Sequence, residues 1–298
     1  MAWPQAISIR LNNMNNAKYI ILADGRRLAY AENGPSEGNP VIAFHGTPGS
    51  RLEQAASPSI LRELNTRLIV VDRPGYGWSD FHEGRRLLDW PDDVIQLADM
   101  LHLDRFRVMG FSGGGAYAAA CAFKIPERLI RVALVSSTAP FDAPGLIDAM
   151  LPANRALFEL AADDYRQAEQ QLAVVAKTPE AVLNILEGPV PAPDKAILSD
   201  ENFRRMYREN LSESLRQGLA GFACDMSLLA QPWCFDPAVI KVEVCLWHGE
   251  QDINVPLVMG QYLATTIPQC QAHFLPDAGH WLLFDHWKEI LQTLTSES

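Results

Sequence analysis

The sequence lacks the features that mark several specialised classes of protein. It has no Cys-x-x-Cys pair, and no histidine lies at metal-ligand spacing from any of its cysteines, which are Cys121, Cys224, Cys234, Cys245 and Cys270. An odd number of scattered cysteines predicts free thiols in a reducing compartment rather than a disulfide framework or a zinc site. Apolar runs such as residues 132–135 and 242–247 are far shorter than the roughly 20 residues that span a bilayer. We therefore expect no metal, no other cofactor and no membrane partner.

Basic side chains are also too few for a protein that binds polyanions. The chain of 298 residues has 36 acidic and 25 basic side chains, which gives a net charge of −11. This charge repels nucleic acids and anionic membrane surfaces, so the expected partner is a small molecule. Residues 1–16 contain no apolar core of signal-peptide length, and we expect a cytoplasmic protein. The 48% hydrophobic content, without low-complexity tracts, is typical of a folded enzyme, and nothing in it indicates an oligomeric state.

Segments of strand and helix character alternate over residues 1–138, stop alternating over residues 139–234, and alternate again to the end of the chain. Asp24-Gly25 separates two strand-like runs, which predicts a β-hairpin. Alternating strands and helices favour a mostly parallel sheet flanked by helices, the α/β class. We expect residues 1–138 and 235–298 to form this core and residues 139–234 to form an inserted helical cap. The expected strands are 18–22, 26–32, 41–44, 67–71, 106–109, 129–135, 242–247 and 272–275, and the expected core helices are 88–101, 113–124, 258–265 and 281–294.

A candidate nucleophile lies between a predicted strand and a predicted helix. The motif Gly110-Phe111-Ser112-Gly113-Gly114 fits the Gly-x-Ser-x-Gly pattern in this context. Such a turn forces the serine into a strained backbone conformation, so its neighbours must be small, and it exposes the hydroxyl above the sheet edge. The alternative is a Gly-rich turn that only packs closely or binds a phosphate. We predict that Ser112 is a catalytic nucleophile.

Three motifs together resemble the α/β-hydrolase superfamily: Phe44-His45-Gly46-Thr47-Pro48-Gly49, Asp72-Arg73-Pro74-Gly75-Tyr76-Gly77-Trp78-Ser79 and the motif around Ser112. The resemblance covers nearly the whole chain outside residues 139–234. It implies an α/β-hydrolase core with an inserted helical cap and places the oxyanion-hole donors at the backbone N–H groups of Thr47 and Gly113. The loop 72–77 is expected to support the site as a structural turn. Arg51 is either a clamp for a substrate carboxylate or a partner in a surface or helix-start salt bridge.

A serine nucleophile needs a histidine base and a carboxylate that orients this base. The superfamily order of serine, acid and histidine points to His280, after the last predicted strand, and to Asp252, after the strand that follows the helical insertion. Glu250 and Asp142 are rival candidates for the acid. His45 and His248 each precede a glycine at a strand end and are expected to order loops.

The predicted machinery suits acyl transfer, and we expect a serine hydrolase that acts on a small, largely apolar ester, thioester or lactone. A serine at this position argues against haloalkane dehalogenase and epoxide hydrolase chemistry. The alternatives are a proline-iminopeptidase-like aminopeptidase, a carbon–carbon bond hydrolase, a haloperoxidase and a receptor-like protein of slow turnover. Candidate substrate contacts are His45, Phe111, Phe141 and Phe222.

Overall fold

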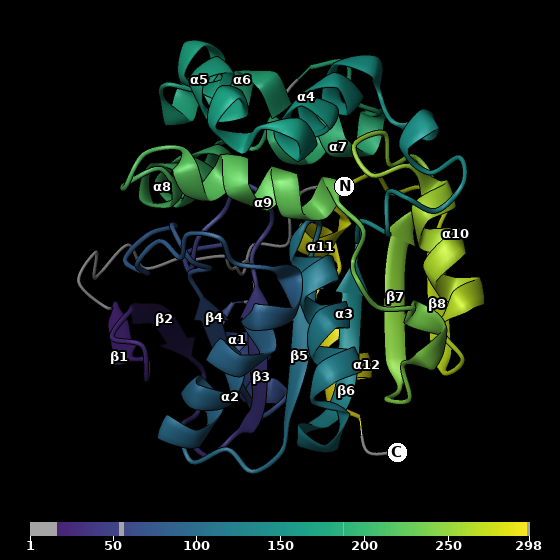
Figure 1. The fold of residues 1–298 in the computed structure, drawn as a ribbon. Coiled ribbons are helices and arrows are strands. Elements are labelled where there is room, and N and C mark those ends of the chain that lie inside the picture. The colour runs from purple at the N-terminus through teal and green to yellow at the C-terminus, as the bar shows by residue number, and fades with distance from the viewer. Residues whose placement is uncertain (1–16, 54–56, 187, 297–298) are drawn as a thin grey trace.

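The computed structural model describes residues 17–53, 57–186 and 188–296. An eight-stranded sheet forms its centre, with the strand order β1-β2-β4-β3-β5-β6-β7-β8 (Figure 1). β2 pairs with β1 and with β4 in antiparallel fashion, whereas the other neighbouring strands are parallel. The α/β class and the mostly parallel sheet predicted from the sequence are thus confirmed. The strands are β1 Lys18–Ile21, β2 Arg27–Asn33, β3 Asn39–Phe44, β4 Thr66–Val71, β5 Phe106–Phe111, β6 Leu129–Val135, β7 Val244–Gly249 and β8 Cys270–Leu275.

Apolar side chains fill both faces of the central strands. In β3, Ile42 and Phe44 belong to one buried cluster, and Val41 and Ala43 belong to another. Successive side chains of a strand point to opposite faces, so the two clusters lie on opposite sides of the sheet. One side is covered by α2 Trp90–Met100, α3 Gly114–Lys124 and α10 Leu257–Thr266, and the other by α1 Pro58–Glu63, α11 Leu282–Asp285 and α12 Trp287–Thr295.

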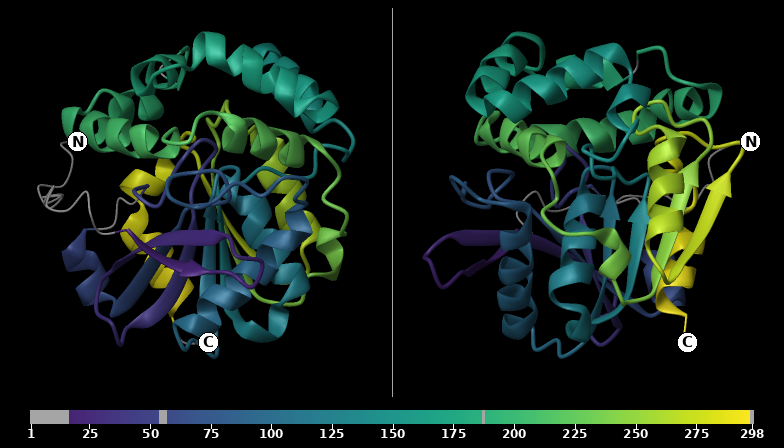
Figure 2. Two further views of the ribbon diagram at one scale, coloured as in Figure 1. Left: turned by 60° about the vertical axis from the view of Figure 1, so that its left-hand side comes forward. Right: turned by 45° about the vertical axis from the view of Figure 1, so that its right-hand side comes forward.

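Residues 139–234, here called the helical segment, lie between β6 and β7. Figures 1 and 2 show its helices as a layer over the end of the sheet at which the parallel strands terminate. Pro152 and Pro179 occupy the first positions of two of these helices, where proline costs no hydrogen bond. The helices are α4 Pro152–Asp163, α5 Tyr165–Val175, α6 Pro179–Leu186, α7 Ala192–Leu198, α8 Glu201–Ser214 and α9 Ala220–Ala230.

Two core elements differ from the expectation. The loop between β3 and β4 contains the short helix α1, whose first turn is capped by the Ser57 hydroxyl. The single closing helix expected over 281–294 consists of α11 and α12, because the backbone leaves the helical conformation at His286. Neither a glycine nor a proline marks that break. Within the described ranges, no helix combines the length and the apolar character that a membrane crossing requires.

Candidate active site

Ser112 follows the last residue of β5 and precedes α3. Its φ angle of 54° lies in the left-handed region, a conformation that costs a non-glycine residue about 1–3 kcal/mol. The surrounding glycines make this turn sterically possible. A Cβ on Gly110 would collide with the Gly114 backbone, and a Cβ on Gly114 would collide with the carbonyl oxygens of Phe44 and His45. The small residues predicted for this turn are therefore a steric requirement of the fold.

The structure brings His280 and Asp252 together with Ser112. His280 Nε2 lies 3.1 Å from Ser112 Oγ, and His280 Nδ1 lies 2.8 Å from Asp252 Oδ2. Asp252 is buried, and its Oδ1 accepts hydrogen bonds from the backbone amides of Asn254 (2.9 Å) and Val255 (2.8 Å). These amides fix the carboxylate, which can then hold the ring with its proton on Nδ1. Nε2 is left free to accept the proton of the serine hydroxyl.

Several charges act on the His280 imidazole. Burial disfavours the protonated ring, but Asp252, Asp194 and Glu53 favour it more strongly, so the pKa of His280 is raised above its ordinary value of 6.5. A raised pKa makes the ring a stronger base and stabilises the imidazolium that forms when it takes a proton.

The rival acids and histidines lie in other surroundings. Glu250 and Asp142 are exposed. His45 is buried; its Nδ1 donates to Gly46 O (2.8 Å) and its Nε2 accepts from the Arg73 amide (3.1 Å). Burial, reinforced by Arg73, holds the pKa of His45 well below its ordinary value. The fully buried His248 donates to Val255 O at 2.9 Å. Both histidines bond to loop backbone.

Thr47 and Gly113, the predicted oxyanion donors, lie next to each other. A Cβ on Gly113 would collide with Thr47 Oγ1 and would lie 2.8 Å from Leu229 Cδ1 of α9. Among the residues that the structure describes, no acceptor pairs with the Thr47 or Gly113 backbone N–H group. Sequence reasoning missed Leu229, which brings a helix of the segment to the edge of this site.

Two buried groups hold the loop before Thr47: Arg73, which belongs to the 72–77 turn, and Glu53, which the sequence did not single out. Arg73 donates to His45 O and, at 3.0 Å, to Gly46 O. Glu53 accepts the Gly46 amide hydrogen at 2.5 Å, and burial raises the pKa of this carboxyl to about 7. Arg73 binds the carbonyl oxygens of His45 and Gly46, and Glu53 binds the amide of Gly46. Together they orient the loop that carries the Thr47 amide.

The four candidate substrate contacts have different positions. Phe111 is buried with its ring centroid 5.3 Å from that of His280, so it adjoins the site. Phe141 is buried against Phe158 of α4, with ring centroids 5.1 Å apart. Phe222 is half-buried on α9. His45 is engaged with loop backbone, as described above. The structure therefore brings Phe111 alone of this group into ring contact with His280.

A buried ionic cluster links α9 to the core beneath the Thr47 loop. Asp225 Oδ2 accepts from Arg73 Nη2 (2.6 Å), and Asp225 Oδ1 accepts from Arg85 Nη2 (2.5 Å) and from the Tyr117 hydroxyl (2.5 Å). Burial opposes the charge on Asp225, but Arg73 and Arg85 outweigh burial and keep its pKa well below the ordinary value. Two guanidinium groups and one carboxylate leave this cluster with one net positive charge.

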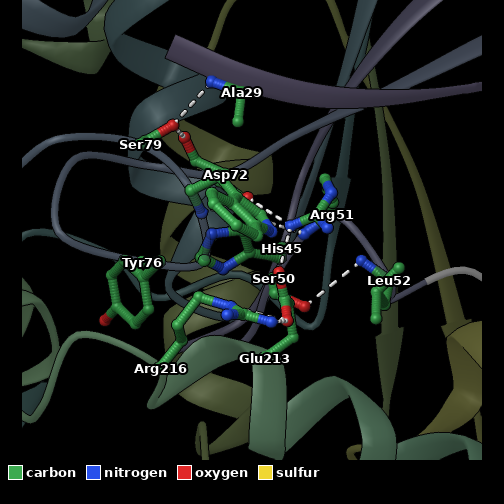
Figure 3. A network of polar contacts seen from close by, with 12 residues as sticks. Ala29, His45, Ser50, Arg51, Leu52, Asp72, Tyr76, Ser79, Glu213 and Arg216 are labelled. Atoms are coloured by element: carbon green, nitrogen blue, oxygen red, sulfur yellow. Dashed lines mark hydrogen bonds and ion pairs between the residues drawn. The ribbon is translucent and has the colours of Figure 1, made fainter. Parts of the chain in front are cut away.

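Arg51 is the centre of a second polar link (Figure 3). Its Nη1 lies 2.7 Å from Asp72 Oδ2 and 2.7 Å from Glu213 Oε1, the latter on α8. With 2% of its surface exposed, Arg51 occupies a buried salt bridge, so the expected surface salt bridge is wrong in its location. Both carboxylates bind Nη1 and balance the charge of the buried guanidinium, which argues against its use as a substrate clamp. Asp72 also accepts the Trp78 amide, consistent with a structural role for this turn.

No group of three or more His, Cys, Asp or Glu side chains within the described ranges is arranged to hold a metal ion. All five cysteines are free thiols, and Cys121, Cys224 and Cys245 are buried.

A strained serine at the end of a parallel strand, hydrogen-bonded to a histidine that is itself bonded to an aspartate, is the arrangement typical of α/β-hydrolases. Comparison with known proteins agrees with this class. The family model of the alpha/beta hydrolase fold matches residues 39–286, and the chain belongs to this family. The family predicted from the motifs is confirmed.

Individual relatives are distant but match most of the chain. A 2-hydroxymuconate semialdehyde hydrolase of Pseudomonas putida is 26% identical over 280 residues, which cover 89% of this chain and 88% of the relative. A putative 2-succinyl-6-hydroxy-2,4-cyclohexadiene-1-carboxylate synthase of Bacillus subtilis is 27% identical over 265 residues, covering 88% and 90%. The crystal structure of an esterase from Rhodococcus sp. superposes with a TM-score of 0.68 at 20% identity and covers 95% of this chain and 99% of that one.

Proposed function

We propose that this α/β-hydrolase is a serine hydrolase that cleaves a small, largely apolar ester, thioester or lactone through an acyl-enzyme on Ser112. The observation that carries the proposal is the continuous hydrogen-bonded path from Ser112 Oγ through His280 to Asp252, with distances of 3.1 and 2.8 Å. Acyl transfer by a serine requires these three functional groups: a nucleophile, a base that takes its proton, and a carboxylate that orients this base and stabilises its protonated form.

In the proposed reaction His280 Nε2 takes the hydroxyl proton as Ser112 Oγ attacks the acyl carbon. The negative charge that develops on the substrate oxygen is met by the Thr47 and Gly113 N–H groups, and removal of one such donor typically costs about 10²–10³ in rate. His280 then returns the proton to the leaving oxygen or sulfur, and the acyl-enzyme forms. Water, deprotonated by the same ring, releases the acid and restores Ser112.

The helical segment supports the apolar character of the proposed substrate. Leu229 of α9 approaches Gly113, and Phe111 adjoins His280, so apolar side chains flank the candidate nucleophile from two directions. We propose that residues 139–234 act as a cap and that their apolar side chains select the acyl or alcohol group.

Labelling by a fluorophosphonate probe, followed by peptide mass spectrometry, tests the nucleophile. We expect modification of Ser112 in the wild type and none at that peptide in Ser112→Ala. Ser212→Ala, which replaces an exposed serine on α8, is the matched control and should label like the wild type. Label on a peptide without Ser112 would contradict the proposed mechanism.

Asp252→Asn tests the acid. Asparagine keeps the shape of the side chain but can present an NH₂ donor, instead of a carboxylate oxygen, to His280 Nδ1. We expect kcat to fall by about 10⁴-fold without loss of the fold. Glu250→Gln is the matched control, since Glu250 is exposed and lies two residues away. Near-normal turnover by Asp252→Asn would remove Asp252 from the mechanism.

Carbon–carbon bond hydrolysis is the second candidate, favoured by the relative named 2-hydroxymuconate semialdehyde hydrolase. A panel of p-nitrophenyl esters of increasing acyl length, run beside 2-hydroxymuconate semialdehyde, separates the two reactions. The ester proposal predicts a higher kcat/KM on at least one ester, absent in Ser112→Ala. A preference for the semialdehyde of more than about tenfold would favour the second candidate.

A further inference from the structure

We infer that Asp194, a residue of the helical segment, is a positioning residue for His280: it holds the main chain on which the base is mounted and places a second carboxylate beside it. The inference rests on the proposed function, in which His280 is the base. It gives the helical segment a role in the chemistry besides substrate selection.

The geometry ties one carboxylate to two consecutive backbone amides. Asp194 Oδ2 accepts from the His280 amide at 3.0 Å, and Asp194 Oδ1 accepts from the Trp281 amide at 3.0 Å. Asp194 lies on α7, is fully buried, and is 86 residues from His280 in the sequence. These two amides belong to the two peptide units that flank the His280 Cα. Binding both of them fixes the backbone at His280, and with it the direction in which the imidazole leaves the main chain.

Gly279 makes the contact possible. A Cβ at this position would collide with all three atoms of the Asp194 carboxyl group. The glycine before the candidate base therefore serves the close approach of a side chain from another part of the molecule. Its presence in the loop is explained by this packing requirement.

Asp194 has no cationic side chain as a partner in the part of the chain that the structure describes. A buried carboxylate without a counter-ion is costly, and two amide hydrogen bonds offset only part of that cost. The positive charge that acts on Asp194 is that of the His280 ring when it is protonated. Proton transfer from Ser112 creates that positive charge, so the field of Asp194 favours the state that the reaction must pass through.

The groups that face His280 come from several elements. Asp252, in the loop after β7, binds the ring at Nδ1, and His248 of β7 lies 3.7 Å from the same carboxylate. Glu53, in the loop after β3, and Asp194, on α7, act on the ring through space. Asp252 and His248 belong to the core, so Asp194 is the carboxylate through which the helical segment acts on the base.

Asp194→Asn tests this role because it keeps the size of the side chain and one acceptor oxygen while it removes the charge. The readouts are the pH dependence of kcat/KM on the best ester and a direct NMR titration of the His280 imidazole. We expect the His280 pKa to fall by about 0.5–1 unit and kcat to fall by about 10–100-fold, as misplacement of a catalytic group by about 1 Å produces, with KM within about threefold of the wild type.

Asp200→Asn is the matched control. Asp200 also accepts two backbone amides, those of Asn202 and Phe203, in the same segment, but it caps α8 and has no contact with His280. We expect it to lower stability slightly and to leave the His280 titration unchanged. A purely structural role for Asp194 predicts the same of Asp194→Asn, and coincident titrations of His280 in that variant and the wild type would overturn the inference.

A measurement on the unaltered protein covers the case in which Asp194→Asn does not fold. The amide protons of His280 and Trp281 should move together in the wild type as one buried carboxyl titrates. If the chemical shifts of these amide protons do not change as a buried carboxyl group titrates, the inference is overturned. Because these titrations need no substrate, failure of the proposed function, seen as absence of label on Ser112, is distinguishable from failure of the role of Asp194.

Discussion

His280 determines how the activity should depend on pH. The ring must be neutral to accept a proton, and its pKa is raised because Asp252, Asp194 and Glu53 together outweigh the effect of burial. We therefore expect kcat/KM on a neutral ester to fall about tenfold per pH unit on the acid side of a midpoint above about 6.5. Initial rates from pH 5 to 9 measure this midpoint, with enzyme returned to pH 8 as the control for inactivation. A midpoint below 6, or no acid limb, would contradict the assignment.

For single residues, the sequence was informative where the immediate neighbours of a residue restrict its backbone geometry. Ser112 could be singled out because small residues must surround a strained turn, and His280 because it follows a strand near the end of the chain. Asp194 and Glu53 gave no such signal. Each is one carboxylate among 36 acidic residues, and its role depends on a partner elsewhere in the structure. Arg51 shows the same limit, since its buried partner Glu213 is 162 positions away.

Asp225 of α9 is a buried charge whose removal should lower the free energy of unfolding strongly. Asp225→Asn leaves Arg73 and Arg85 buried with weaker partners, and breaking a buried ion pair typically costs about 3–5 kcal/mol. We expect a loss of free energy of unfolding in that range, measured by urea titration. Asp163→Asn on α4, where the side chain is exposed, should change stability by less than about 0.5 kcal/mol. A loss below about 1 kcal/mol for Asp225→Asn would mean that the cluster does not hold α9 to the core.

Helices and strands whose apolar residues recur at a regular spacing could be predicted from the sequence. Short helices and breaks within helices could not. Residues 129–135 form β6 at the predicted bounds, and the helical spacing over 88–101 corresponds to α2 with a one-turn extension before it. Helix α1 has six residues, too few for a period to stand out from a loop rich in glycine and proline. The break at His286 is marked by neither a glycine nor a proline, so the sequence carries no local sign that α11 ends before α12 begins.

For the whole molecule, alternation of strands and helices predicted a parallel sheet interrupted by a helical segment. The position of that segment over the sheet edge depends on contacts between residues more than 80 positions apart, such as Asp194 with His280 and Arg51 with Glu213. Pattern analysis of one chain does not report such pairs. The stop in alternation over residues 139–234 predicted the helical insertion, whereas the polar links that join this segment to the core emerged from the structure.

These links lead to a prediction about unfolding. Separation of residues 139–234 from the sheet would deprive Arg73 and Arg85 of Asp225 and would leave Arg51 with Asp72 as its remaining carboxylate partner. Breaking a buried ion pair typically costs about 3–5 kcal/mol. Chains of this size often unfold through intermediates. Here we expect the helical segment and the core to unfold together.

Urea unfolding followed by two signals tests this coupling. Far-UV circular dichroism reports on helices of both parts. Tryptophan fluorescence reports mainly on residues outside the helical segment, because Trp233 is the one tryptophan of residues 139–234 and the other six are Trp3, Trp78, Trp90, Trp247, Trp281 and Trp287. The two midpoints should coincide in the wild type. In the double variant Glu213→Gln with Asp225→Asn, the dichroism midpoint should fall below the fluorescence midpoint, because the segment can then melt first. Separate midpoints in the wild type would show that these buried links do not join the two parts into one cooperative unit.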